Sequence, residues 1–189
     1  MNTLNARPTQ LAEVYWIEPQ IFGDDRGFFF ESFNARAFNQ AIGRDVSFVQ
    51  DNHSKSRRGV LRGLHLQTRK PQGKLIRVTQ GVIFDVAVDL RMDSDTFGQW
   101  VGFTLDAEHH HQLWIPEGFG HGFLTLSETA EVQYKATDFY DPGHEVSVAW
   151  NDPEVAIDWP LNGLVPQCSS KDQAGLALSE FKARYQSEE

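Results

Sequence analysis

The feature that most constrains the fold is the run of residues 82–90, where side-chain character alternates at every step. Its even-numbered positions are Val82, Phe84, Val86, Val88 and Leu90, and its odd-numbered positions are Ile83, Asp85, Ala87 and Asp89. Successive side chains of a β-strand point to opposite faces, so a period of two indicates a strand rather than a helix. The run therefore predicts one strand with a continuous apolar face.

Similar extended patterns recur along the chain, and glycine, proline, aspartate or asparagine separates them at short intervals. They predict strands over residues 28–33, 46–50, 74–80, 101–105, 112–115, 121–126, 132–140 and 146–150. Many short strands with turn signals between them are typical of a β-sandwich or barrel. We therefore predict an all-β fold and not one built from βαβ units.

Two short helices are predicted outside the strands. The first covers residues 34–43, where Asn34 is a good N-cap, Gly43 ends the helix, and Phe38 and Ile42 share a face. The second covers residues 174–185, because its apolar residues recur at helical spacing and it contains an oppositely charged pair four positions apart. These residues are Leu178, Phe181 and Tyr185, with the pair Glu180 and Arg184.

The bulk properties exclude several classes of protein. A chain of 189 residues fits one domain, without a second domain, repeat or linker. The net charge of −9 disfavours nucleic-acid binding, and the apolar runs are too short to cross a membrane. The N-terminus does not resemble a signal peptide, and Cys168 is the single cysteine, so we expect a cytoplasmic protein without disulfides.

Two segments are similar to the halves of a metal-binding cupin motif. The first half of that motif is His-x-His followed by Glu and, seven residues later, Gly; here His65 and Gly81 match, but Gln67 and Lys74 replace two ligands. The second half, Pro-x-Gly-x-x-His, matches residues 116–121. A lysine ammonium has no lone pair for a metal. The pattern therefore predicts chemistry that uses a base and a fixed positive charge without a metal.

Polar residues also occur where a strand should face the core. Lys74 shares strand parity with Ile76 and Val78, so its ammonium should point to an apolar side, where a carboxylate such as Asp85 could pair with it. Tyr134 shares parity with neighbouring apolar residues of its own strand. Taken alone, Lys74 could be a solvated edge residue, and Tyr134 and the histidines could be structural. Their joint occurrence with the two half motifs favours a functional site.

The order of several motifs resembles the RmlC, or dTDP-4-dehydrorhamnose 3,5-epimerase, family of the cupin superfamily. The motifs are FGDDRGFFFE at 22–31, QDNHS at 50–54, LRGLH at 61–65, QGK at 72–74, FDVAVD at 84–89, WIPEG at 114–118 and SKD at 170–172. The resemblance runs through residues 12 to 175 without a large insertion. It implies a cupin-like jelly-roll β-sandwich with a few peripheral helices. The jelly-roll core should cover residues 12–152 and a C-terminal helical segment residues 172–186 of one domain, 1–189.

The resemblance also implies an activity. Such a protein acts, without metal or cofactor and normally as a homodimer, on a dTDP-4-keto-6-deoxy sugar. It inverts C3 and C5, which both flank the C4 ketone, by removing a proton and returning one to the opposite face. His65 would be the base, Asp172 would orient it, Lys74 would stabilise the oxyanion, and Tyr134 would supply the returning proton.

The family's substrate contacts can be assigned by the same motifs. Arg26, Arg62 and Lys171 would hold the diphosphate and sugar; Glu31, Gln50, Asp51, Asn52, Lys74, His121 and Glu145 would make further contacts; Phe22 and Tyr140 would stack on thymine. Outside the motif context, Glu145 and Lys171 could be solvated charges.

Two further points bear on function. The run His109–His111 suggests a metal site, but adjacent strand residues point to alternate sides and cannot meet one ion, so we predict a polar turn. Three functions remain open. They are the 3,5-epimerase, an enzyme that inverts one centre or isomerises another dTDP-deoxysugar, and a non-catalytic sugar-nucleotide-binding cupin. Intact His65, Tyr134, Asp172 and Lys74 argue against the last.

Overall fold

The computed structural model describes residues 4–186, which form mainly antiparallel strands. The strands are β1 (Asn5–Pro8), β2 (Tyr15–Glu18), β3 (Phe22–Asp24), β4 (Gly27–Phe29), β5 (Gln50–Arg57), β6 (Leu61–Gln67), β7 (Lys74–Gln80), β8 (Val82–Asp89), β9 (Trp100–Asp106), β10 (Gln112–Ile115), β11 (Phe119–Thr125), β12 (Thr129–Ala136) and β13 (Glu145–Ser147). The helices are α1 (Ala35–Ile42), α2 (Ser170–Gln173) and α3 (Leu178–Tyr185).

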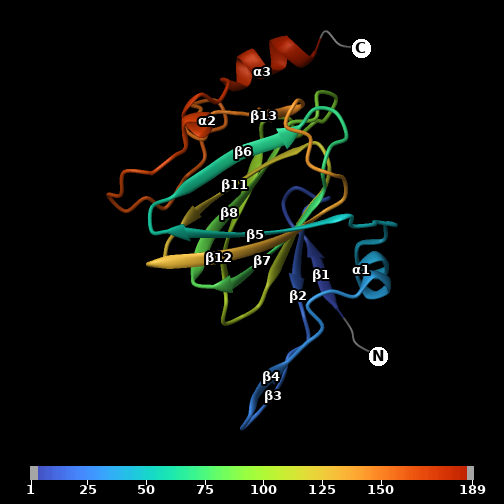
Figure 1. The fold of residues 1–189 in the computed structure, drawn as a ribbon. Coiled ribbons are helices and arrows are strands. Elements are labelled where there is room, and N and C mark those ends of the chain that lie inside the picture. Colours follow the sequence, from blue (N-terminus) through green and yellow to red (C-terminus); the bar gives the residue numbers. More distant parts are fainter. Residues whose placement is uncertain (1–3, 187–189) are drawn as a thin grey trace.

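Two facing sheets make a jelly-roll β-sandwich, as predicted. One sheet has six strands in the order β1-β2-β10-β7-β12-β5, and the other has five in the order β13-β6-β11-β8-β9. Figure 1 shows the short β3–β4 hairpin reaching away from both sheets, while α2 and α3 lie beside the five-stranded sheet. The space between the two sheets contains the main hydrophobic core and, beside it, a pocket lined by both sheets.

Strand β8 is buried on both faces, which explains its strong apolar signal. Ile83 and Ala87 pack in the core between the sheets. Val86 and Val88 face the other way and pack with Trp159 and other residues of the C-terminal segment. The C-terminal segment thus covers the outer face of the five-stranded sheet. Burying both faces also explains why the predicted alternation contains apolar residues on each side.

Helix α1 agrees with its prediction. Asn34 caps its first turn by accepting a hydrogen bond from Ala37 N, and Gly43 adopts the left-handed conformation that ends it. Phe38 and Ile42 are buried against the outer face of the six-stranded sheet. The helix therefore closes the side of that sheet which faces away from the five-stranded one.

The C-terminal helix begins later than predicted. Residues 174–177 run alongside the chain after β13: Leu176 N donates to Ser147 O at 2.9 Å, and Ala149 N donates to Leu176 O at 2.8 Å. These bonds engage the backbone that a helix would need, so α3 starts at Leu178. Leu178 and Phe181 are buried as predicted. In the described part of the chain, no helix is long and apolar enough to cross a membrane.

Several strand predictions were wrong in extent. The segment 28–33 is a strand only up to Phe29, and Gln50 is the one residue of 46–50 that belongs to a strand. The strands predicted over 132–140 and 146–150 end at Ala136 and Ser147. In each case, the remaining residues have side chains typical of strands but lie in loops and turns. Strands β1, β2, β3 and β6, and all of β5 beyond Gln50, were not predicted, and β5 and β6 line the pocket described next.

Candidate active site

An open pocket with a cavity volume of about 350 Å³ lies between the two sheets. Strands β5, β7 and β12 contribute one wall, β6 and β11 contribute the other, and residues after β12 border it. Among the residues predicted from the sequence, those that line it are Gln50, Asn52, Arg62, His65, Lys74, His121, Tyr134, Tyr140 and Glu145. Segments far apart in the sequence thus meet in one cavity.

His65 forms a close pair with Asp172. Its Nε2 lies 2.5 Å from Oδ1 of Asp172, the third residue of α2. The same carboxylate accepts hydrogen bonds from Ser169 Oγ at 2.7 Å and Gly63 N at 3.3 Å. Burial alone would raise the pKa of Asp172, but the bonds from His65, Ser169 and Gly63 lower it to about 2. The carboxylate is therefore charged at neutral pH and orients a half-buried imidazole.

A β-bulge brings Arg62 and His65 to the same wall. They are three positions apart and would face opposite sides of a regular strand. Between the pairs that these two residues make with β11, however, β6 contains one residue more than β11. Close packing at the bulge requires glycine, because a Cβ on Gly63 would lie 2.5 Å from Cα of Gly122. The bulge therefore adds a guanidinium to the pocket beside the imidazole.

Lys74 opens β7 and is 7% exposed. Burial lowers the pKa of its ammonium to about 8, and the charges of Glu145 and Asp85 partly oppose this shift. No carboxylate in residues 4–186 lies close enough to Lys74 for a direct ion pair, so the predicted pairing with Asp85 is only a longer-range one. Lys74 thus presents to the cavity a positive charge that burial destabilises and that no direct ion pair within residues 4–186 neutralises.

Asp85 instead bonds to His121. Oδ1 of Asp85 lies 2.7 Å from His121 Nε2, and both side chains are buried. The other oxygen of Asp85 has no hydrogen-bond partner within residues 4–186. The pocket therefore contains a second imidazole–carboxylate pair, which the sequence motifs predicted only through His121.

Tyr134 comes from the wall opposite to His65, because it lies on β12 of the six-stranded sheet whereas His65 lies on β6 of the other. Burial and the charge of Glu145 raise the pKa of its phenol, so the hydroxyl keeps its proton at neutral pH. Its ring centroid is 6.5 Å from that of His121. The cavity thus has a protonated phenol on one wall and an oriented imidazole on the other.

Glu145 joins two residues at the edge of the pocket. Tyr140 Oη donates to its carboxylate at 2.6 Å, and Lys171 forms an ion pair with it. Burial would raise the pKa of Glu145, but Lys171 and Tyr140 lower it. The bond to Glu145 raises the pKa of Tyr140 to about 12. Lys171 directly precedes Asp172 in α2, so one short helix supports two parts of the pocket.

The inward face of β5 is polar. Gln50 Nε2 donates to Asn52 Oδ1 at 2.9 Å, and Ser56 Oγ accepts from Arg62 Nε at 3.0 Å. Sequence reasoning assigned Gln50 and Asn52 but missed Ser54, which continues the same face and lines the pocket. The signal that could have found it is the alternation Gln, Asn, Ser, Ser at every second residue of 50–56.

Two predicted residues lie on the β3–β4 hairpin and not in this pocket. Phe22 and Arg26 line a separate shallow pocket on the hairpin, where Arg26 pairs with Asp24. Phe28 and Phe29 of the same hairpin are also strongly exposed. Figure 1 shows the hairpin directed away from the sandwich. Within one chain, the structure does not bring Phe22 or Arg26 to His65.

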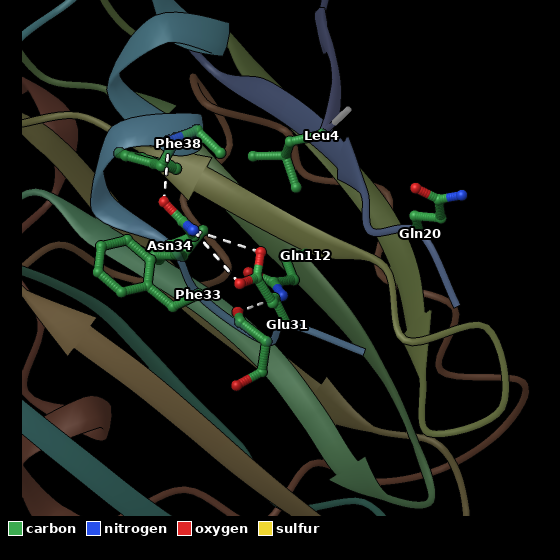
Figure 2. Close-up of a pocket in the computed structure, with 10 residues that line it drawn as sticks. Leu4, Gln20, Glu31, Phe33, Asn34, Phe38 and Gln112 are labelled. Carbon is green, nitrogen blue, oxygen red and sulfur yellow. Dashed lines mark hydrogen bonds between the residues drawn. The ribbon is translucent and has the colours of Figure 1, made fainter. Parts of the chain in front are cut away.

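Glu31 and Asp51 also lie outside the pocket. Figure 2 shows Glu31 beside Asn34 and Gln112 in a separate pocket near α1, with Asn34 Nδ2 donating to its carboxylate at 3.3 Å. Asp51 points outward from β5, and Lys135 Nζ donates to its carboxylate at 2.9 Å. Motif matching therefore collected residues that one chain holds in different places.

The three consecutive histidines form a polar turn between β9 and β10, as predicted. His109 contacts Asp106, whereas the ring of His110 stacks on Phe30 with centroids 4.8 Å apart and on Phe28 at 4.5 Å. The ring of His111 lies 4.8 Å from that of Trp16. Across residues 4–186, no group of three or more histidines, cysteines or acids is arranged to hold a metal ion.

Comparisons with known proteins show the family to which the chain belongs. The model of the family described as dTDP-4-dehydrorhamnose 3,5-epimerase matches residues 8–180. A dTDP-4-dehydrorhamnose 3,5-epimerase of Pseudomonas aeruginosa is 61% identical over 92% of this chain and 97% of its own length. A dTDP-4-dehydrorhamnose 3-epimerase of Streptomyces niveus is 40% identical over 95% of this chain and 86% of its own.

The crystal structure of the Legionella pneumophila enzyme RmlC, a dTDP-6-deoxy-D-glucose-3,5-epimerase in complex with dTDP-4-keto-L-rhamnose, is similar throughout. Its TM-score is 0.92 at 51% identity, with 96% of each chain covered.

Proposed function

The chain belongs to the dTDP-4-dehydrorhamnose 3,5-epimerase family, and from this membership and the geometry of its pocket we propose its reaction. It converts dTDP-4-dehydro-6-deoxy-D-glucose to dTDP-4-dehydro-L-rhamnose by inverting C3 and C5, in dTDP-L-rhamnose biosynthesis. The observation that carries the proposal is the opposition of His65, paired with Asp172, and Tyr134 across one cavity. Inversion needs proton transfer on opposite faces of a carbon, and this arrangement suits it.

His65 is the base. With its proton on Nε2, toward Asp172, the lone pair on Nδ1 accepts a proton from the carbon beside the C4 ketone. The electrons of the broken C–H bond move to the ketone oxygen and form an enolate. The charged Asp172 stabilises the imidazolium that results, without itself taking the proton.

Lys74 stabilises the enolate. One charge pair at about 4 Å with an effective dielectric near 20 is worth about 4 kcal/mol before desolvation. Because Lys74 has no direct carboxylate partner among residues 4–186, its ammonium is available for the oxyanion. This is the role that a metal would take in a cupin with an intact ligand set, and Gln67 and Lys74 replace those ligands. We therefore propose a reaction without metal or cofactor, in which a chelator leaves the rate unchanged.

Tyr134 completes each inversion. Its phenol gives a proton to the carbon on the face opposite to His65, while the enolate electrons form the new C–H bond and restore the ketone. The raised pKa of Tyr134 keeps the proton in place until the enolate forms. Exchange with solvent then returns a proton to Tyr134 and removes one from His65, so the enzyme is unchanged.

The remaining pocket residues hold the nucleotide sugar. Arg62 in the pocket and Lys171, which pairs with Glu145 at the pocket edge, provide positive charge for the diphosphate, and Tyr140 offers an exposed aromatic ring for thymine. Gln50, Asn52, His121 and Glu145 line the same pocket and provide further polar contacts.

We propose a homodimer in which the hairpin of one subunit reaches the pocket of the other. Phe22, Phe28 and Phe29 are exposed on a hairpin that leaves its own sandwich, and Arg26 lies at its tip. Exposed aromatic residues next to a cation suit a second copy of the chain and its bound anion. Glu31 and Asp51 would contact substrate through the same association.

The dimer proposal can be tested by mixing two impaired variants, Arg26→Ala and His65→Ala. In a mixed dimer, one pocket has an intact His65 and receives an intact Arg26, so activity should return to about a quarter of the wild-type level after subunit exchange. Mixed dimers that form, as seen by native mass spectrometry, but remain inactive would contradict a shared site.

The reaction itself is tested by incubation with dTDP-4-keto-6-deoxyglucose in deuterated water, followed by NMR. Deuterium at both C3 and C5 is expected. Label at one carbon would instead indicate an enzyme that inverts a single centre, and no label would indicate a binding protein.

We also propose a cytoplasmic location, which the single cysteine supports because it leaves the chain without an internal disulfide. Detection of the protein in another compartment after cell fractionation would overturn it.

A further inference from the structure

The loop that follows β12 carries two aromatic side chains that are largely exposed and therefore do not anchor the loop by packing in the core. Phe139 is 64% exposed and Tyr140 is 53% exposed. A loop without buried apolar side chains depends on its backbone hydrogen bonds for a defined position. The position of the Tyr140 ring at the pocket therefore depends on what binds residues 138–141.

The side chains of three glutamines, Gln50, Gln67 and Gln72, make hydrogen bonds to the backbone of residues 138–141. Gln72 Nε2 donates to Asp138 O at 2.7 Å, from the segment before β7. Gln50 Oε1, from β5, accepts from Tyr140 N at 2.9 Å. Each of these amides holds the loop at one point.

Gln67, at the end of β6, holds the loop at two points. Its Nε2 donates to Phe139 O at 3.3 Å and to Lys70 O at 2.9 Å, and its Oε1 accepts from Asp141 N at 2.9 Å. It thus bonds to the backbone on both sides of Tyr140. It is 4% exposed, so these bonds are shielded from water.

The amide of Gln67 has no hydrogen left for a substrate, because both hydrogens on Nε2 are used by backbone carbonyls. It also lies two residues from His65 on the same strand and therefore on the same face. Gln67 consequently links the strand that bears the base to the loop that bears Tyr140.

We propose that Gln67, at the position where a metal-binding cupin has a ligand, is a positioning residue that holds Tyr140 for stacking on the nucleotide base. This inference rests on the proposed function, in which Tyr140 contacts thymine. Gln67 sets nucleotide affinity and leaves the proton chemistry of His65 unaffected.

The test uses Gln67→Met, which keeps the side-chain volume and removes all three hydrogen bonds. The Kd for dTDP should rise about five- to tenfold, as should KM for the nucleotide sugar, while kcat stays within about twofold. Amide hydrogen exchange at residues 139–141 should become faster. Gln133→Met, at a half-buried position outside this pocket, is the matched control and should change none of these quantities.

A double variant separates positioning from a general loss of structure. If Gln67 acts through Tyr140, adding Gln67→Met to Tyr140→Ala should weaken dTDP binding by less than about twofold further. Unchanged exchange at residues 139–141, unchanged dTDP affinity, or full additivity of the two variants would overturn the inference. The measurements of dTDP affinity and of amide exchange need no turnover, so an inactive wild-type protein would refute the proposed reaction separately.

Discussion

Two imidazole–carboxylate pairs face the same pocket, and their surroundings differ. The side chain of His65 is 29% exposed, whereas that of His121 is 8% exposed. Asp172 receives additional hydrogen bonds from Ser169 and Gly63, whereas one oxygen of Asp85 has no such partner in the described residues. The pair of His65 and Asp172 is therefore accessible, and its carboxylate has several hydrogen-bond donors. The pair of His121 and Asp85 is buried, and its carboxylate has a donor on only one oxygen among the described residues.

The two pairs can therefore serve different roles in one pocket, one in proton transfer and the other in electrostatic support. His65 is open to a substrate and has a carboxylate held in the charged state, which suits proton transfer. Asp85 has one oxygen without a hydrogen-bond partner among residues 4–186, and its charge raises the pKa of Lys74, which suits electrostatic support. We expect the first pair to carry the chemistry and the second to maintain the field around Lys74.

The largest expected effect tests this division directly. His65→Ala should lower kcat by about 10⁴-fold and abolish solvent exchange at C3 and C5, because no base remains. His121→Ala should lower kcat by only about ten- to a hundredfold. Steady-state kinetics and deuterium incorporation measure both. Comparable losses of kcat in the two variants would contradict the assignment of proton transfer to His65 alone.

A smaller effect is expected for the carboxylates. Asp172→Asn should lower kcat by about 10³-fold with little change in KM, because the imidazolium loses its counter-charge. Asp85→Asn should lower kcat by about tenfold at pH 7. If Asp85→Asn proved the more damaging of the two, His121 would be the better candidate for the base.

The pH dependence of the rate tests the support that Asp85 gives to Lys74. Because the pKa of Lys74 is about 8 in the protein without substrate, kcat/KM should fall about tenfold per pH unit above that value as the ammonium is lost. In Asp85→Asn, this alkaline limb should move to lower pH, because a charge that raises the pKa is gone. Lys74→Arg should remove the limb, since guanidinium stays charged. A limb that is identical in all three proteins would exclude Lys74 as its source.

The smallest expected effect is one of stability. Lys74→Met should raise the free energy of unfolding at pH 7 by about 3 kcal/mol while it impairs turnover, since the buried ammonium is costly in the folded state. The folded pKa lies below the unfolded one, so the cost is fully present below pH 8 and disappears as pH rises toward 10.5. Urea unfolding across this range measures it; a constant difference between the proteins would refute it.

Hydrophobic alternation predicted most of the strands that build the core and missed β5 and β6, two strands that line the pocket. The apolar alternation of β6 changes phase between Leu61 and Leu64, where the bulge lies. β8 and β10 face buried apolar surroundings, and their predicted positions agree with the structure. β5 was missed because its inward side chains are polar: Gln50, Asn52 and Ser54 face the cavity, and Ser56 accepts a hydrogen bond from Arg62. A strand that forms a polar site lacks the apolar signal by which strands are recognised.

The motif order predicted most of the pocket, but it could not distinguish residues of one wall from residues elsewhere. His65, Lys74 and Tyr134 meet in one cavity, whereas Arg26 and Glu31 lie outside it in the same chain. Sequence motifs record which residues serve a function, and they contain no information on the subunit or surface that presents each one.

The sequence by itself determined the all-β class, the capped helix α1 and the replacement of two metal ligands by Gln67 and Lys74, because these depend on local periodicity and on side-chain chemistry. The family resemblance implied that Asp172 orients His65, 107 positions away, whereas the folded chain alone showed that Asp85 bonds to His121 rather than to Lys74 and that Gln67 holds the Tyr140 loop. These contacts depend on sheet pairing, on the bulge in β6 and on competition between neighbouring partners. Such long-range choices have no local pattern in the chain.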